Sequence, residues 1–192
     1  MLILKPQTKI HPSSPRPGLS SEDEMFYYFA YGSCMCPVDL ERSLGEDTHN
    51  YVIGPATLKN YRLGFYFYSQ KRQCGALDVV KSASHSVEGV LYRLPWRLSK
   101  YLDERECVAQ SGYRHEMVNI HHQNKVFQNV RTYVTVNKLK EELAPNDWYS
   151  GVVLRGAKAC GLSEQYCCKL FAHIHQLRAS QEEMMGLQLA AS

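Results

Sequence analysis

The amino-acid sequence predicts an α+β domain in which a small β-barrel, or a strongly curled sheet, is accompanied by helices. Two observations support this fold class. Between residues 25 and 136, short apolar or aromatic segments alternate with turn-forming residues, at a spacing typical of small barrels. From Pro145 onward, the apolar residues recur with a helical period instead. A chain of 192 residues is long enough to enclose a sizeable core in one domain.

The chain divides into three parts by composition. Residues 1–24 contain five Pro or Gly residues and several Ser, which predicts a flexible N-terminal arm that could dock on another subunit. Residues 25–178 form the predicted domain. Residues 179–192 are expected to be a C-terminal tail with some helical character.

The composition excludes several classes of protein. Hydrophobic residues make up 44% and charged residues 21%, the balance of a soluble globular protein. The net charge of +3 is small and the sequence contains no stripe of basic residues, so we expect no nucleic-acid partner. No run of about 18 apolar residues predicts a membrane span. The apolar stretch after Met1 is too short for a secretory signal, so we expect a cytoplasmic protein with its seven cysteines reduced.

The strand predictions rest on aromatic and β-branched content. The first strand, Phe26–Ala30, is too short and too aromatic for a helix. A pair of strands is expected within Tyr51–Ser69, broken at Gly54-Pro55. Gly89, inside another strand, marks a bulge or a close backbone approach. The remaining strands are expected at 75–80 and 87–94, with a hairpin of 113–120 and 125–136.

The helix predictions rest on start and stop signals. Pro37 suits the first turn of a short helix that ends before Gly45. Ser99 is a candidate N-cap for a helix that reaches Cys107. Two C-terminal helices follow, one over about 147–159 and one capped by Ser163. The second carries an apolar stripe of Tyr166, Leu170, Ile174 and Leu177.

The turn Tyr31-Gly32-Ser33 is the first candidate binding element. Gly32 has no Cβ, so another group can come close, and Ser33 offers a hydroxyl and a free amide hydrogen. A strand that ends in such a turn can aim consecutive N–H groups at an anion. We therefore interpret the turn as a holder for a substrate carboxylate, although the tripeptide by itself favours an ordinary turn.

The acidic cluster Asp103-Glu104-Arg105-Glu106 is the first candidate catalytic element. Glu106 precedes apolar Val108, so its side chain could point inward. Burial and the neighbouring acids would then raise the pKa of Glu106 and make it a useful general base near neutral pH. The spacing alone favours the simpler interpretation of solvated charges on a short helix.

Three further candidates are weaker. Cys34 could pair with a distant histidine as a nucleophile, but a buried thiol is the preferred interpretation. Tyr149 could close a pocket wall or simply pack at a helix start, and both interpretations stay open. The pairs Cys34-x-Cys36, His121-His122 and His173-x-His175 lack zinc spacing, so we expect no metal.

Four segments follow one another along the chain: Tyr28-Phe29-Ala30-Tyr31-Gly32-Ser33, Val87-Glu88-Gly89-Val90-Leu91-Tyr92, Leu102-Asp103-Glu104-Arg105-Glu106, and Gly156-Ala157-Lys158 ahead of Gly161-Leu162. Taken together they resemble the γ-glutamylcyclotransferase family, and the resemblance extends over about residues 25–177. The resemblance implies a compact mixed barrel with helices packed outside, no cofactor, and a possible homodimer.

The resemblance also implies roles for particular residues. Glu106 falls on the catalytic acid/base of the family, and Tyr149 on a substrate-contacting tyrosine. The substrate-binding loop of the family falls on Tyr28, Phe29, Ala30, Tyr31, Gly32 and Ser33. Two departures stand out, since family members usually have Asn where this chain has Cys34 and Gly where it has Cys107. The first is expected to alter the hydrogen bonding of the loop, and the second to raise the pKa of the base further.

The implied activity is the cyclisation of a γ-glutamyl group to 5-oxoproline with release of an amine or amino acid. Two alternatives stay open. The pocket could belong to a non-catalytic module that binds a small γ-glutamyl metabolite, or Cys34 could serve a thiol enzyme. The sequence does not specify the leaving group.

Overall fold

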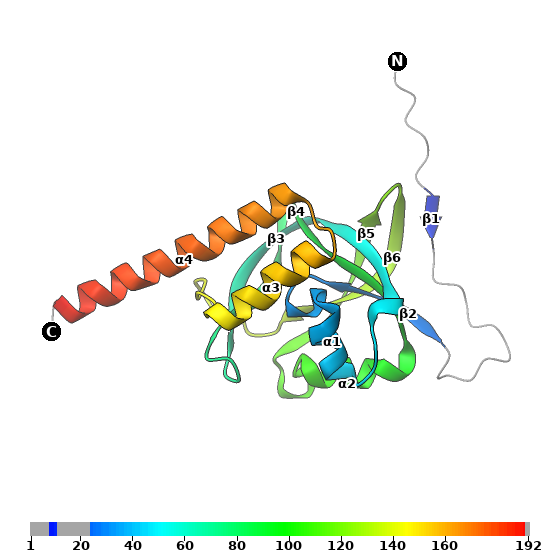
Figure 1. Ribbon diagram of the computed structural model, residues 1–192, viewed down its shortest axis with the longest axis horizontal. Helices are drawn as coiled ribbons and strands as arrows, with labels where there is room; N and C mark the ends of the chain where they lie inside the picture. Colours follow the sequence, from blue (N-terminus) through cyan, green and yellow to red (C-terminus); the bar gives the residue numbers. More distant parts are fainter. Residues whose placement is uncertain (1–7, 11–23, 191–192) are drawn as a thin grey trace, which may run out of the picture.

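A computed structural model describes residues 8–10 and 24–190 of the chain. Its centre is a closed barrel of five strands with helices packed around it, as expected from the sequence (Figure 1). The strands of the described residues are β1 (Thr8–Ile10), β2 (Met25–Ala30), β3 (Val52–Ser69), β4 (Cys74–Pro95), β5 (Tyr113–His122) and β6 (Lys125–Thr135). The α-helices are α1 (Pro37–Leu44), α2 (Ser99–Arg105), α3 (Asp147–Ala159) and α4 (Glu164–Ala190).

The sheet is mixed, and its closure comes from β6. The strand order is β1-β6-β2-β4-β3-β5, and β5 pairs with β6 as well. β2 is antiparallel to β4 but parallel to β6, where Tyr28 lies opposite Arg131. Part of the predicted N-terminal arm joins the sheet, because β1 pairs in parallel with the start of β6. The rest of that arm lies outside the described residues.

The two long strands β3 and β4 differ from the prediction. The pair of strands expected within 51–69 is one strand of 18 residues, and the strands expected at 75–80 and 87–94 are parts of one strand of 22 residues. Gly54 does not end β3, because a register shift between Val52 and Gly54 absorbs it as a bulge. Further shifts follow at Lys59/Tyr61 and Gly64/Phe67, and they let the strands curl around the barrel.

The helix ends follow the predicted local signals, with one exception. Gly45 ends α1 in the left-handed conformation, with φ of +74°. The Ser163 hydroxyl accepts the Tyr166 amide hydrogen at 3.2 Å and so caps α4. Ser99 was expected to be a cap, but it is the first residue of α2 and its hydroxyl accepts a hydrogen bond from Arg131 instead.

Two glycines mark places where backbones touch. A Cβ on Gly89 would lie 2.3 Å from the carbonyl oxygen of Ala30, which confirms the close approach predicted in β4. A Cβ on Gly156 in α3 would lie 2.8 Å from the amide nitrogen of Cys36. Helix α3 is therefore seated directly on the segment that follows β2.

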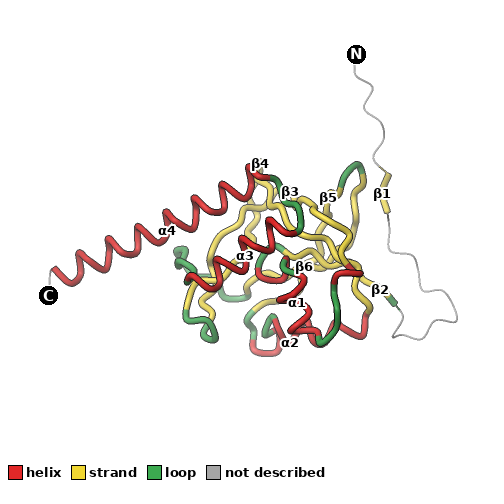
Figure 2. Tube along the Cα trace, in the orientation of Figure 1, coloured by secondary structure: helices red, strands yellow, loops and turns green. Residues whose placement is uncertain are grey.

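Helix α4 extends well beyond the barrel (Figure 2). Leu170 and Ile174 are buried on its predicted stripe, whereas Met184 and Leu187 near its end are exposed. No helix of the described residues is long and apolar enough to cross a membrane.

Candidate active site

The candidate site is a cavity of about 920 Å³. Parts of the chain that lie far apart in sequence line it: the end of β2 and the segment after it, α1, the end of α2 with the loop that follows, the β3–β4 hairpin, residues of β5 and β6, and α3. Six of the eight predicted site residues line it: Tyr28, Tyr31, Gly32, Ser33, Glu106 and Tyr149. Phe29 and Ala30 are buried and do not belong to the lining.

Glu106 lies just after α2, where its amide hydrogen still bonds to the Leu102 carbonyl at 3.0 Å. Only 17% of its side chain is exposed, so the carboxyl group points into the protein rather than into bulk water. Burial raises the pKa of Glu106 above the ordinary value, and Asp103 adds to this effect. Arg105, the Cys34 thiol and Arg72 act in the opposite direction.

The turn after β2 continues into a short 3-10 helix, Ser33–Met35. Its first hydrogen bond runs from the Met35 amide to the Gly32 carbonyl at 3.0 Å, so the amides of Ser33 and Cys34 precede the first intrahelical donor. The Tyr31 hydroxyl donates to the Tyr133 carbonyl at 2.6 Å and fixes the turn against β6.

Tyr149 stands beside this turn. Asn146 caps α3 by accepting the Tyr149 amide hydrogen at 2.9 Å, which sets the position of the ring. The phenol oxygen accepts the Leu77 amide hydrogen at 3.2 Å and lies 3.4 Å from where a Cβ on Gly32 would be. Because the oxygen is already an acceptor, its own hydrogen can be donated to a ligand in the cavity.

Cys34 lies between charged groups rather than beside a histidine. Its sulfur accepts from Arg105 Nε at 3.0 Å and donates to Glu106 Oε1 at 3.2 Å. Burial raises the pKa of Cys34 to about 12, although Arg105 opposes the shift. A thiol this weakly acidic is a poor nucleophile near neutral pH, so the geometry does not support the thiol-enzyme alternative.

Cys107 adopts the left-handed conformation, with φ of +53° and ψ of +41°. Its side chain is exposed, and its sulfur lies 3.9 Å from the Arg105 carbonyl oxygen. The backbone here is one that glycine adopts without strain, which gives a physical reason for the glycine usual in the resembled family.

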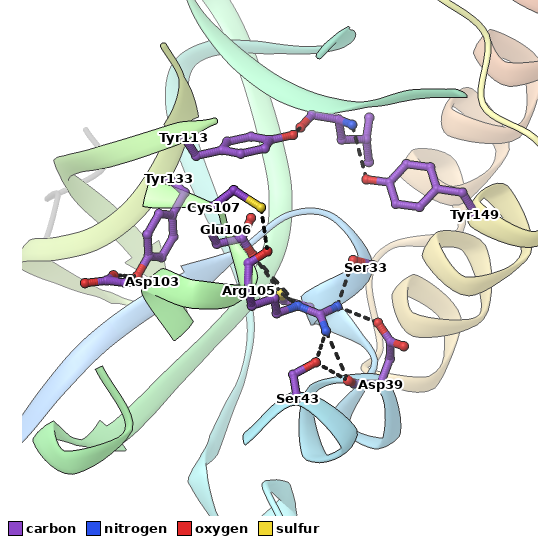
Figure 3. A network of polar contacts seen from close by, with 12 residues as sticks. Ser33, Asp39, Ser43, Asp103, Arg105, Glu106, Cys107, Tyr113, Tyr133 and Tyr149 are labelled. Carbon is purple, nitrogen blue, oxygen red and sulfur yellow. Dashed lines mark hydrogen bonds and ion pairs between the residues drawn. The ribbon is translucent and has the colours of Figure 1, made fainter. Parts of the chain in front are cut away.

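Sequence reasoning missed four residues of the site. Arg105 binds Asp39, Ser33 and Ser43, which come from α1 and the turn after β2 (Figure 3). The others are Arg72 in the β3–β4 hairpin and two tyrosines, Tyr113 and Tyr133. The strand pattern of 113–120 and 125–136 could have indicated the tyrosines, but nothing local marks Arg72.

The histidines of the pair His173-x-His175 contact other side chains. His173 Nε2 contacts Glu142 Oε2 at 2.6 Å, and the His175 ring packs on Phe171. Among the described residues, one group of three side chains has ligand-like proximity, and it consists of exposed Glu41, Asp47 and His49. Asp47 and His49 hydrogen-bond to each other there at 2.8 Å.

Comparison with known proteins places these features in a family context. The sequence model of the AIG2-like family matches residues 86–170. The chain is 31% identical over 159 residues to YkqA of Bacillus subtilis (strain 168), whose naming as a gamma-glutamylcyclotransferase is itself provisional; the match covers 83% of this chain and 56% of YkqA. The chain thus spans little more than half the length of that relative.

Two further comparisons agree. The gamma-glutamylcyclotransferase of Mus musculus is 28% identical over 155 residues, which cover 79% of this chain and 80% of the mouse protein. A solved structure of a gamma-glutamyl cyclotransferase superposes with a TM-score of 0.71 at 27% identity, over 78% of this chain and 88% of the other. These findings confirm the resemblance drawn from the four motif segments.

Proposed function

We propose that this chain, which is similar to γ-glutamylcyclotransferases in sequence and in fold, cyclises a γ-glutamyl group to 5-oxoproline and releases an amine or amino acid. One observation carries this proposal. A largely buried carboxylate, Glu106, shares a cavity of about 920 Å³ with the turn Gly32-Ser33. A volume of this order suits a small-molecule substrate.

The proposed reaction is an intramolecular aminolysis. The α-amine of the substrate attacks its own γ-carbonyl carbon, a new C–N bond closes the five-membered lactam, and the C–N bond to the leaving group breaks. Glu106 takes a proton from the α-ammonium group and delivers it to the leaving nitrogen, and the second proton that the α-nitrogen loses as it becomes the lactam N–H also ends on the released amine, which leaves as an ammonium ion. No water is consumed. Burial shifts the pKa of Glu106 upward, toward neutral pH, and this direction suits both steps because a base is more effective as its pKa approaches the working pH.

The walls of the cavity supply the folded conformation that the reaction needs. Holding the γ-glutamyl chain bent places nucleophile and electrophile together, which can lower the barrier by several kcal/mol. The amide hydrogens of Gly32 and Ser33 and the Tyr149 hydroxyl would hold the α-carboxylate. Arg72, in the β3–β4 hairpin, adds a positive charge to the cavity lining. Its guanidinium carbon lies 5.2 Å from the centre of the Tyr149 ring.

A substrate panel tests the proposal. Purified protein is incubated with γ-glutamyl amino acids, glutathione and γ-glutamylamines, and 5-oxoproline is measured by mass spectrometry. The expected result is release from at least one class. Binding without release would favour the non-catalytic module instead, and the preferred substrate would identify the leaving group.

A pair of variants tests the role of Glu106. Glu106→Gln keeps the shape and removes the base, so we expect turnover to fall by about 10²- to 10⁴-fold. Glu164→Gln is the matched control, because it removes one carboxylate from the exposed start of α4, which does not line the cavity. Turnover by Glu106→Gln at the parent rate would show that Glu106 is not the acid/base. The possible homodimer and the cytoplasmic location remain predictions, which light scattering and cell fractionation would check.

A further inference from the structure

Arg105 connects the base to the substrate turn. Its side chain is only 11% exposed. One terminal nitrogen, Nη2, donates to Asp39 Oδ2 at 2.6 Å and to Ser33 Oγ at 3.0 Å, and the other donates to the Ser43 hydroxyl. The guanidinium therefore ties the end of α2 to α1 and to the turn after β2 (Figure 3).

The remaining donor of the guanidinium reaches Glu106 through a sulfur atom. Arg105 Nε donates to Cys34 Sγ at 3.0 Å, and the Cys34 thiol donates to Glu106 Oε1 at 3.2 Å. The direct separation from Arg105 Nε to Glu106 Oε1 is 3.9 Å, too long for a hydrogen bond. The thiol thus fills the gap, as acceptor from the cation and donor to the carboxylate.

We propose that Cys34 and Arg105 are positioning residues that aim the Glu106 carboxylate into the cavity and hold it in its ionised form. The inference rests on the proposed function for its role in turnover. An ionised carboxylate accepts hydrogen bonds more strongly than a neutral carboxyl group, so a donor at 3.2 Å favours the base form. The Cys34 thiol keeps its proton to donate in ordinary assays, because burial raises the pKa of the thiol to about 12.

Cys34 and Arg105 oppose other influences that favour the protonated form of Glu106. Burial and Asp103 raise the pKa of Glu106, whereas Arg105, the thiol and Arg72 lower it. The other titratable groups facing Glu106 are phenols on the surrounding elements, namely Tyr28, Tyr31, Tyr113 and Tyr149. Loss of either positioning residue must therefore raise the pKa of Glu106.

A titration of the Glu106 carboxyl group tests the inference directly. Protein carrying ¹³C in its glutamate carboxyl groups is titrated by NMR, and the Glu106 signal is assigned by its absence in Glu106→Gln. Cys34→Ala removes the donor, and we expect the midpoint to move up by about 0.5 to 1 pH unit. Arg105→Gln is expected to move it in the same direction, and Cys34→Ser, which keeps a donor, is expected to lie between.

The chain offers a matched control. Cys74 is as buried as Cys34, at 4% exposure, and starts β4 outside the cavity lining. Cys74→Ala is expected to leave the midpoint at the wild-type value. A Cys34→Ala midpoint equal to that of Cys74→Ala would overturn the inference.

A second measurement is made on wild-type protein, and a variant is used only to assign the signal. The infrared S–H stretching band of Cys34, assigned by its loss in Cys34→Ser, is followed in otherwise unaltered protein across the titration. We expect it to move to lower frequency as Glu106 ionises, because the thiol then donates to an anion. An S–H stretching frequency that stays constant while Glu106 ionises would overturn the inference.

The pH–rate profile links the pair to turnover. The acid limb of kcat/KM is expected to move up in Cys34→Ala by the same amount as the NMR midpoint, with the rate recovering at higher pH. A merely structural loss would lower the rate at every pH instead. If wild-type protein releases no 5-oxoproline from any γ-glutamyl compound, the proposed function fails, and the NMR and infrared titrations still decide the inference.

Discussion

Replacement of Cys107 by glycine should stabilise the protein. Cys107 has φ of +53° and an exposed side chain. A residue with a Cβ pays about 1–2 kcal/mol in this conformation, whereas glycine does not. Glycine in turn loses about 0.5–1 kcal/mol more backbone entropy on folding. The difference is a gain of about 0.5–1 kcal/mol, or about 1–4 °C in Tm for a domain of this size.

The assay compares thermal unfolding of wild type, Cys107→Gly and Cys107→Ala by circular dichroism at one pH. Cys107→Ala keeps the Cβ and the strain, so it should unfold near the wild-type temperature. Cys107→Gly no more stable than Cys107→Ala would refute the strain argument. The same variants test the sequence-based expectation that Cys107 raises the pKa of the base, since the exposed side chain predicts an unchanged acid limb for Cys107→Gly.

Four further outcomes are expected. Tyr149→Phe removes the donor proposed for the substrate, so steady-state kinetics should show KM raised about 2- to 10-fold with kcat largely kept; a loss in kcat alone would implicate the phenol in the chemical step. Arg72→Gln should raise KM for anionic substrates, more at low salt than at high salt, and an unchanged KM at every salt concentration would remove it from the binding site. Gly89→Ala forces a Cβ to 2.3 Å from a backbone oxygen of β2 and should cost about 1–3 kcal/mol in urea unfolding, whereas Gly186→Ala, within α4 and with no atom within 4 Å, should gain up to about 1 kcal/mol. Glu106→Gln should gain stability relative to wild type as pH rises from 4.5 through the raised pKa, because the folded wild type holds that proton more tightly than the unfolded chain; a difference independent of pH would refute the buried-acid assignment.

Local signals predicted the short elements well. Helix α1 and helix α3 occupy the predicted residues, because Pro37 and Gly45 bound the first and the helical period defines the second. The hairpin of β5 and β6 also follows its alternating pattern. In each case the decisive interactions lie within a few residues of the element itself.

The long strands could not be predicted in this way. Gly54-Pro55 resembles a strand end, and the polar stretch Lys81–Ser86 resembles a loop, yet both lie within continuous strands. Partner strands distant in sequence decide this outcome, since the pairing of β3 with β4 tolerates a bulge wherever the barrel must curve.

The site could be predicted only in part, because some of its interactions also join residues that are distant in sequence. The family motifs brought Glu106 and Gly32 together, and the cavity contains both. Arg105 looked like one charge in an acidic run, but its partners Asp39 and Ser43 lie more than sixty residues away in sequence. The packing of α2 against α1 buries Arg105 and brings it into hydrogen-bonding contact with Asp39 and Ser43.

The contact between Gly156 and Cys36 also limits how this pocket can change. A Cβ on Gly156 would lie 2.8 Å from the Cys36 amide nitrogen, so α3, which carries Tyr149, has little room to shift toward the segment after β2. Under the proposed function, a different leaving group is expected to be accommodated in other parts of the lining, such as the β3–β4 hairpin that carries Arg72. A library of substitutions in residues 70–73 is the place to look for altered substrate range.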